Sequence, residues 1–163
     1  MKYEQEGLRH LPGSISGVFS VSALSAENVL ASYSNIGSNI QFAAPGGDYV
    51  IDEGYLDITK LIYTSYPTDL DNMLGSIGIP QGYMFSAGTS FAAPAVSAAI
   101  ADYYAYYQKI TGERPTLEII ENDLASTCLD LGDPGKDRSY GYGLPNVSDT
   151  YEVITDHPSP ISQ

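Results

Sequence analysis

The chain has 163 residues, enough for one domain with one hydrophobic core, and 43% of them are hydrophobic. Twenty acidic residues against seven basic ones give a formal net charge of −13, which argues against nucleic acid or an anionic membrane surface as a partner and favours basic peptides. The single cysteine, Cys128, excludes an internal disulfide and a multi-cysteine metal site, and we expect it to be a buried core residue.

Two buried strands are predicted in the first third of the chain. Residues 18–24 and 40–44 are rich in β-branched and small apolar residues, a composition typical of strands. Residues 25–38 between them mix turn formers with small polar residues, and residues 1–13 are polar and predicted to be irregular.

The segment after Pro45-Gly46-Gly47 is acidic. It has two interpretations, a cation site or a solvated loop. The spacing does not fit a loop that wraps oxygen ligands around one ion, and runs of charge usually face water. We therefore expect a solvated acidic loop and no metal site. The carboxylates are Asp48, Asp52, Glu53 and Asp57.

The next part of the chain leads to a turn of small residues. Residues 58–66 are predicted as a strand or edge strand, and residues 69–82 as a loop with several turn formers. Residues 83–85 then deliver the chain to the turn that contains Ser90.

A long helix is predicted over residues 92–107, with its end near Thr111-Gly112. This run is apolar or aromatic on nearly every face and has one charge, at Asp102, which suits a helix buried on all sides inside a larger body. Such a helix requires a host to cover it.

The residues just before this helix place Ser90 at its N-terminus. Gly88 allows close backbone approach, Thr89 can cap free amides, and Pro94 lies near the first turn, where a missing amide costs least. At a helix N-terminus, unpaired N–H groups and the positive end of the helix dipole stabilise negative charge on a substrate oxygen. Gly88-Thr89-Ser90 taken alone is also an ordinary capping sequence.

A second, amphipathic helix is predicted over residues 115–125. Its apolar positions, Leu117, Ile120 and Leu124, recur at helical spacing, and Thr116 stands near its start. We expect it to pack on the outside of the sheet. Residues 132–142 are then predicted as a turn-rich loop.

After Asn146 we expect a short helix or coil, and then a tail or linker. Residues 1–150 are predicted to form part of one domain, and residues 151–163 to lie outside it. Because strands alternate with helices, the natural architecture is α/β and layered, with a largely parallel sheet.

Three blocks of this chain, of which the upstream one consists of three short runs, resemble the subtilisin-like serine proteases, the subtilases. The pattern G-T-S-x-A-x-P is similar to their nucleophile motif. The residues that match it are Gly88, Thr89, Ser90, Ala92 and Pro94. Upstream blocks agree in content and order at residues 21–24, 31–37 and 42–47, and Gly141 to Asn146 is similar to the G-x-G-x-x-N stretch that closes many subtilase domains.

The resemblance covers about residues 11 to 150 and implies a partial subtilisin-like domain of three layers, with the central helix starting at the nucleophile. The segment 61–67 and the tyrosine-rich stretches look most like the exported Gram-positive branch, which includes lantibiotic leader peptidases. The resemblance to subtilases also implies peptide-bond hydrolysis on a peptide or protein substrate, with Ser90 as the nucleophile and Gly88 and Thr89 in the oxyanion turn.

The family's catalytic Asp, catalytic His and oxyanion-hole Asn have no counterpart in this chain, which begins downstream of where they would stand. His10 aligns with a loop before the strand at residues 18–24, and His157 lies in a proline-rich tail, so we expect neither to act as the base. The chain is therefore expected to be inactive alone. It should dock to a missing N-terminal part of the domain or self-associate.

Two alternatives remain, a non-catalytic peptide-binding or structural module and a sedolisin-type protease, whose nucleophile motif also begins G-T-S. Residues 42–47 and Ala92 fit subtilases better. Subtilases often bind calcium, so calcium is possible in a full-length relative, although Gln41 replaces an acidic residue of a weak cation site found in some members. We expect no cofactor in this chain.

The resemblance also implies a parent protein that is secreted or displayed at the cell surface. The chain itself has no basic-then-apolar N-terminus of the kind a signal peptide requires, and no apolar run of the ~18 residues of a membrane span. We therefore expect no signal peptide and no membrane segment in this chain.

Overall fold

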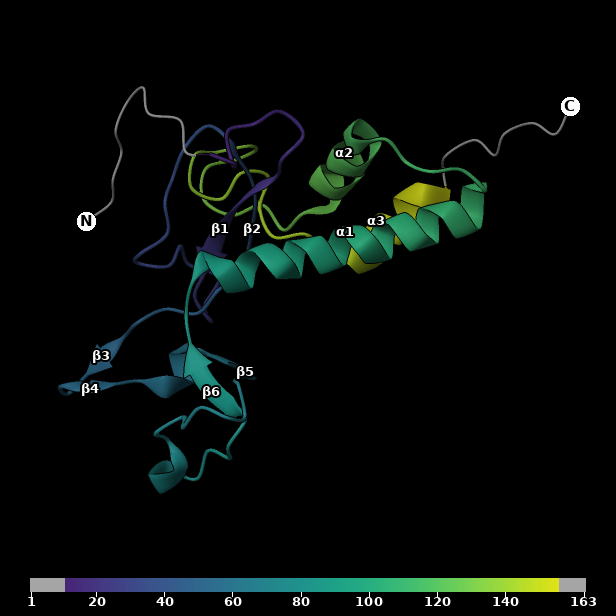
Figure 1. Ribbon diagram of the computed structural model, residues 1–163. Helices are drawn as coiled ribbons and strands as arrows, with labels where there is room; N and C mark the ends of the chain where they lie inside the picture. The colour runs from purple at the N-terminus through teal and green to yellow at the C-terminus, as the bar shows by residue number, and fades with distance from the viewer. Residues whose placement is uncertain (1–10, 156–163) are drawn as a thin grey trace, which may run out of the picture.

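Six strands and three α-helices form in residues 11–155, the part of the chain that the computed structural model describes (Figure 1). In chain order these are β1 (Ser20–Leu24), β2 (Ile40–Pro45), β3 (Ile51–Asp52), β4 (Tyr55–Leu56), β5 (Ile62–Ser65), β6 (Tyr83–Ser86), α1 (Thr89–Thr111), α2 (Leu117–Thr127) and α3 (Val147–Thr155). Short 3₁₀ helices occupy Ile58–Lys60 and Gly75–Ile77.

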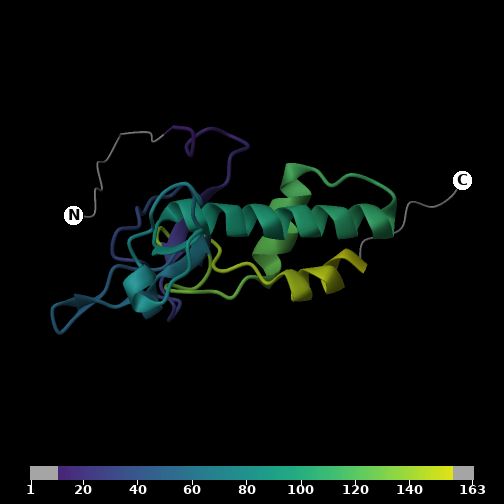
Figure 2. The same ribbon diagram turned by 60° about the horizontal axis from the view of Figure 1, so that its bottom comes forward.

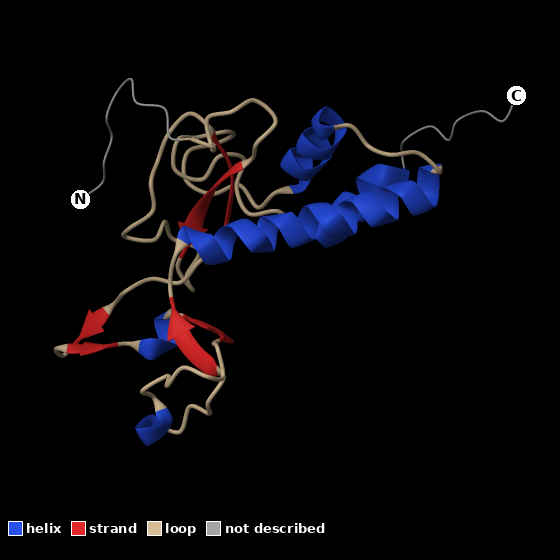
Figure 3. Cartoon of the chain, viewed as in Figure 1, coloured by secondary structure: helices blue, strands red, loops and turns tan. Residues whose placement is uncertain are grey.

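The two predicted buried strands pair in parallel, as the α/β architecture requires. In β1 and β2, Val21 lies opposite Phe42 and Ala23 lies opposite Ala44. The small alanines at the centre of this pair let α1 pack on it, and Figure 3 shows the long helix running past both strands. The core forms between this pair and the helices. Its largest fully buried side chains are Tyr103, Phe42, Leu24, Leu124 and Ile154.

The central helix α1 is present, but in this chain it is buried along one stripe and not on all sides. The stripe consists of Ala92, Val96, Tyr103 and Tyr107. Other apolar positions, including Ala98 and Ala101, face solvent. The sequence predicted burial all round; the difference arises because β1, β2, α2 and α3 cover only part of the helix surface.

The second predicted helix forms as α2, and its cap is as expected. The side chain of Thr116 accepts a hydrogen bond from the Ile119 amide at 3.3 Å, and Ile120 and Leu124 are buried. The expectation that α2 covers the outside of the sheet is wrong, because α2 packs on α3 and α1 (Figure 2). Its buried Asp123 accepts a 2.6 Å hydrogen bond from the Tyr103 hydroxyl of α1.

Helix α3 continues past residue 150, where the sequence placed the end of the domain. Ile154 is fully buried and belongs to the core. The hydroxyls of Thr127 and Thr150 lie 2.6 Å apart and join α3 to α2. The packed body therefore includes residues up to Ile154, and the rest of the expected tail, residues 156–163, lies outside the described part.

Residues 48–87 form a separate projection, which we call the hairpin lobe. In Figure 1 it extends away from the body beyond the N-terminus of α1. Its strand pairs, β3 with β4 and β5 with β6, are both antiparallel, so the parallel pairing in the described residues is that of β1 with β2. The predicted strand over 58–66 is shorter, because a 3₁₀ helix occupies Ile58–Lys60.

Two further expectations concern Cys128 and membrane spans. Cys128 is half-buried against the core and not part of its buried centre; burial, and to a lesser extent Asp130, raise the pKa of its thiol to about 12. Across residues 11–155, none of the helices combines the length and apolar character that crossing a bilayer requires.

Candidate active site

Ser90 is the second residue of α1 and is exposed to solvent. Strand β6 ends at Ser86, a short turn follows, and Gly88 in extended conformation is the N-cap of the helix. A Cβ at Gly88 would lie 3.9 Å from Ser90 Oγ, an ordinary contact distance. A side chain at this position would therefore contact the Ser90 hydroxyl without a clash at its Cβ.

Two backbone N–H groups at the start of α1 lack a hydrogen-bond acceptor among the described residues. A helix leaves its first N–H groups without partners inside the helix. Here Gly88 donates to the Gly46 carbonyl at 2.9 Å, and Phe91 donates to the Gly88 carbonyl at 3.0 Å. The amides of Thr89 and Ser90 have no acceptor among residues 11–155. Both N–H groups are therefore available to an acceptor from outside the described residues.

Two predicted features of this turn are corrected by the structure. Thr89 was expected to cap the helix, but it is the first helical residue, and the N-cap Gly88 has no side chain to do so. Pro94 was expected where a missing amide costs least, but α1 starts three residues earlier than predicted, so Pro94 stands inside the helix. Its ring nitrogen cannot donate to the carbonyl of Ser90.

The turn is held against the body by Gly46. A Cβ at this position would meet Ala23 Cβ at 2.6 Å and the Gly88 carbonyl at 2.9 Å, so only glycine fits without a shift. The hydroxyl of Tyr33 lies 2.9 Å from the Gly46 carbonyl and 2.8 Å from that of Gly47. Sequence reasoning assigned no role to Tyr33 or Gly46, although both lie in the upstream blocks that resemble subtilases.

Tyr33 is a neutral donor at this position. Burial, together with the nearby Asp48 and Tyr49, raises the pKa of Tyr33 to about 12. At neutral pH its hydroxyl keeps its proton and donates to backbone carbonyls. A second tyrosine, Tyr49, donates to the Ala87 carbonyl at 3.0 Å, so phenol groups support the turn from two sides.

A cavity of about 150 Å³ opens beside Thr89. It is lined by Gly13, Ser20, Val21, Asn35, Ile36, Asn39, Ile40 and Thr89. Ser90 itself is not among the lining residues.

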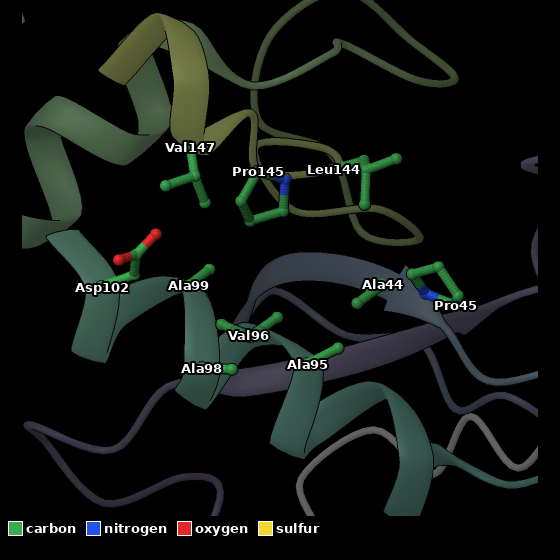
Figure 4. Close-up of a pocket in the computed structure, with 10 residues that line it drawn as sticks. All are labelled: Ala44, Pro45, Ala95, Val96, Ala98, Ala99, Asp102, Leu144, Pro145 and Val147. Atoms are coloured by element: carbon green, nitrogen blue, oxygen red, sulfur yellow. The ribbon is translucent and has the colours of Figure 1, made fainter. Parts of the chain in front are cut away.

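A larger apolar cavity, of about 460 Å³, lies further along α1 and does not include Ser90 (Figure 4). It is lined by Ala44, Pro45, Ala95, Val96, Ala98, Ala99, Asp102, Leu144, Pro145 and Val147. Its one carboxylate, on Asp102, accepts a hydrogen bond from the Tyr151 hydroxyl.

Neither histidine can be placed relative to Ser90, because His10 and His157 both lie outside the described residues. Within residues 11–155, no group of three or more His, Cys, Asp or Glu side chains is arranged to hold a metal ion. Of the acidic residues in the hairpin lobe, Asp48 accepts from the Ser32 hydroxyl at 2.6 Å and Asp57 from the Thr59 hydroxyl at 2.6 Å.

Comparison with known sequences gives a family and a curated relative. The pattern of the subtilase family matches residues 4–143. The minor extracellular protease Epr of Bacillus subtilis (strain 168) is 29% identical over 133 residues, which are 82% of this chain and 16% of Epr.

Solved structures agree with this match. The crystal structure of a lanthipeptide protease is similar with a TM-score of 0.81 and 36% identity, over 88% of this chain and 44% of that one. The epidermin leader peptide processing protease EpiP of Staphylococcus aureus has a TM-score of 0.64 and 24% identity, over 91% of this chain and 34% of that one, and supports the fold alone.

Both structures confirm the predicted fold, and the 36% identical lanthipeptide protease agrees with the predicted likeness to the lantibiotic branch. The chain spans less than half the length of each of these relatives. With a family match over most of its residues, the chain belongs to the subtilase family.

Proposed function

We propose that this chain carries the nucleophile of a serine endopeptidase and that a different polypeptide segment supplies the base. The observation that carries the proposal is the exposed Ser90 at the open N-terminus of α1, with its own amide unpaired. Membership of the subtilase family supports the reaction class, peptide-bond hydrolysis.

The site provides part of the chemistry. Ser90 Oγ would attack the scissile carbonyl, whose oxygen then gains negative charge. The Ser90 amide and the positive end of the α1 dipole stabilise that charge. The attack also requires a base that takes the hydroxyl proton, because a serine hydroxyl that keeps its proton is a poor nucleophile at neutral pH. Residues 11–155 contain no histidine to take this role.

We infer that the segment that supplies the base docks on the exposed side of α1. The solvent-facing side of α1 carries apolar positions such as Ala98 and Ala101. Exposed apolar faces favour association with another chain. The segment that docks would be a peptide from the N-terminal part of such a domain, or a second copy of this chain.

The relatives support an exported parent protein, because one of them is named an extracellular protease. We propose that the substrate is a peptide or protein outside the cell. We propose that the cavity lined by Thr89 receives part of the substrate.

Complementation tests the proposal. The full chain would be mixed with the N-terminal part of the catalytic domain of the lanthipeptide protease that is 36% identical, and hydrolysis of a fluorogenic peptide would be followed. We expect activity from the mixture and none from either part. Ser90→Ala should abolish it. The matched control Ser97→Ala removes another exposed serine of the same helix, whose hydroxyl donates to the Ala93 carbonyl at 3.0 Å, and should retain it.

Two other outcomes are informative. Activity of the mixture that survives Ser90→Ala would contradict the role of Ser90. Association of the two parts without hydrolysis would favour the alternative, a subtilase-derived module that binds peptides without cleaving them.

A further inference from the structure

The outer face of the β5–β6 hairpin carries a row of aromatic rings. Tyr63 lies opposite Phe85 across the two strands, and Tyr83 is two residues before Phe85, so all three side chains share one face. The rings of Tyr63 and Tyr83 stack with centroids 5.2 Å apart and planes 9° apart. The Tyr63 and Phe85 centroids are also 5.2 Å apart. The row therefore runs Phe85, Tyr63, Tyr83.

This row is open to solvent. Tyr63 is 50% exposed and Tyr83 is 45% exposed. Tyr83 ends the row, has Tyr63 as its ring partner among the described residues, and keeps nearly half of its surface exposed. A two-stranded sheet is marginally stable in water without something packed on it. Two adjacent half-exposed aromatic rings on such a sheet mark a surface suited to binding.

The charge of the hairpin lobe indicates which partner fits this surface. Residues 48–87 contain six acidic residues and one basic residue, a formal net charge of −5. The basic residue, Lys60, forms a salt bridge with Glu27 of the body. Asp52, Glu53 and Asp69 have no hydrogen-bond partner among residues 11–155. The lobe therefore attracts cationic partners and repels acidic ones.

We propose that the outer face of the β5–β6 hairpin binds an extended peptide segment that contains arginine. The guanidinium plane stacks on the exposed Tyr83 ring and continues the aromatic row, and the carboxylates of the hairpin lobe balance its charge. Arginine fits better than lysine because its planar group stacks on a ring and sheds water more readily. Binding uses no atom of Ser90 and is independent of the proposed catalysis.

Fluorescence anisotropy tests the proposal on the full chain. The probe is a short fluorescein-labelled peptide with two arginines in a glycine and alanine background. The comparison peptide has citrulline in place of arginine, which keeps the shape and removes the charge. We expect saturable binding of the arginine peptide, about 10-fold weaker binding of the citrulline peptide, and weaker arginine binding as salt rises from about 50 to 300 mM.

Variants locate the site. Tyr83→Ala should weaken binding by about 10-fold, whereas Tyr83→Phe, which keeps the ring, should bind as the wild type does. Tyr55→Ala is the matched control, because Tyr55 is 80% exposed in the same lobe but outside the aromatic row. Circular dichroism checks that each variant is folded. A second route that leaves the aromatic row intact is the double variant Asp52→Asn with Glu53→Gln, which should also weaken binding.

Equal affinity for the two peptides would overturn the proposal, and so would equal losses in Tyr83→Ala and Tyr55→Ala. Ser90→Ala should bind the arginine peptide with unchanged affinity. A chain that binds the peptide but fails in complementation would therefore contradict the proposed catalysis alone, and the reverse result would contradict the peptide site alone.

Discussion

The body of the molecule, residues 11–47 and 88–155, and the hairpin lobe, residues 48–87, use their apolar residues in opposite ways. All the buried hydrophobic side chains of the described residues belong to the body. Of the sixteen large hydrophobic residues that are exposed, ten belong to the lobe, including Tyr63 and Tyr83. The body is therefore stabilised by its own core, whereas the lobe keeps its shape through hydrogen bonds and presents apolar surface outward.

The turn that contains Ser90 lies at the join of these two regions. Strand β6 of the lobe runs into it, and α1 of the body begins at its end. The bond from the Gly88 amide to the Gly46 carbonyl ties the turn to the body. The comparison indicates that the body fixes the position of Ser90, while the lobe presents exposed apolar side chains that are accessible to a binding partner.

The largest expected effect is on the core. Phe42 is fully buried in β2, with the Phe19 ring 5.6 Å away in an edge-to-face arrangement. Phe42→Ala should lower the free energy of unfolding by about 3–5 kcal/mol, because it leaves a cavity. The lobe variant Tyr55→Ala should change it by less than about 0.5 kcal/mol. Urea unfolding measures both free energies. Similar losses of stability in the two variants would contradict the difference drawn between body and lobe.

The join should be the next most sensitive place. Gly46→Ala forces a Cβ against Ala23 and the Gly88 carbonyl, and should cost about 1–3 kcal/mol of unfolding free energy. Gly75→Ala, in the lobe, is its matched control, because a Cβ there meets nothing within 4 Å. Thermal unfolding measures the loss of stability in both variants. A Gly46→Ala variant as stable as the wild type would show that Gly46 does not hold the turn as described.

Tyr33 should make the stability of the join depend on pH. Its folded pKa is about 12 against an ordinary value of 10.0, so the stability that the shift contributes is complete below pH 10 and is lost as the pH rises towards 12. Tyr33→Phe should cost about 1 kcal/mol at pH 8, through the lost hydrogen bond. The gap between wild type and variant should close at high pH. Urea midpoints at several pH values test this, and a constant gap would refute it.

The smallest effect is expected at the surface link between lobe and body. Lys60 of the lobe and Glu27 of the body form an exposed ion pair, and such pairs contribute little and are screened by salt. Lys60→Met should leave the urea midpoint nearly unchanged at low salt and unchanged at high salt. A large shift of the urea midpoint would contradict this, because it would mean that the ion pair holds the lobe on the body more strongly than an exposed pair should.

The sequence predicted an element correctly where its apolar pattern is local and the element packs on another part of this chain. The apolar runs predicted β1, β2 and α2, and Thr116 predicted the start of α2. The hairpin of β3 and β4 was missed, although Glu53 and Gly54 both have positive φ, as a tight turn requires, and Gly54 was the signal for it. The antiparallel pairing of β5 with β6 depends on a return loop whose path no local pattern fixes.

For the site, the motif predicted where Ser90 and Gly88 would stand, because both belong to one continuous turn. It could not predict the support from Tyr33 and Gly46, since these residues reach the turn only through the fold. The exposure of α1 was also beyond sequence reasoning: apolar residues predict burial, but they do not say whether the covering surface belongs to the same chain.

The most direct test of the central claim, that Ser90 requires a base from another segment, is labelling of the isolated full chain with a fluorophosphonate probe, read by intact mass beside Ser90→Ala. Labelling requires an activated hydroxyl. The account predicts no labelling of the isolated chain and labelling of Ser90 once the complementing segment is added. Labelling of the isolated chain that disappears in Ser90→Ala would contradict it, because a base would then reach Ser90 within this chain.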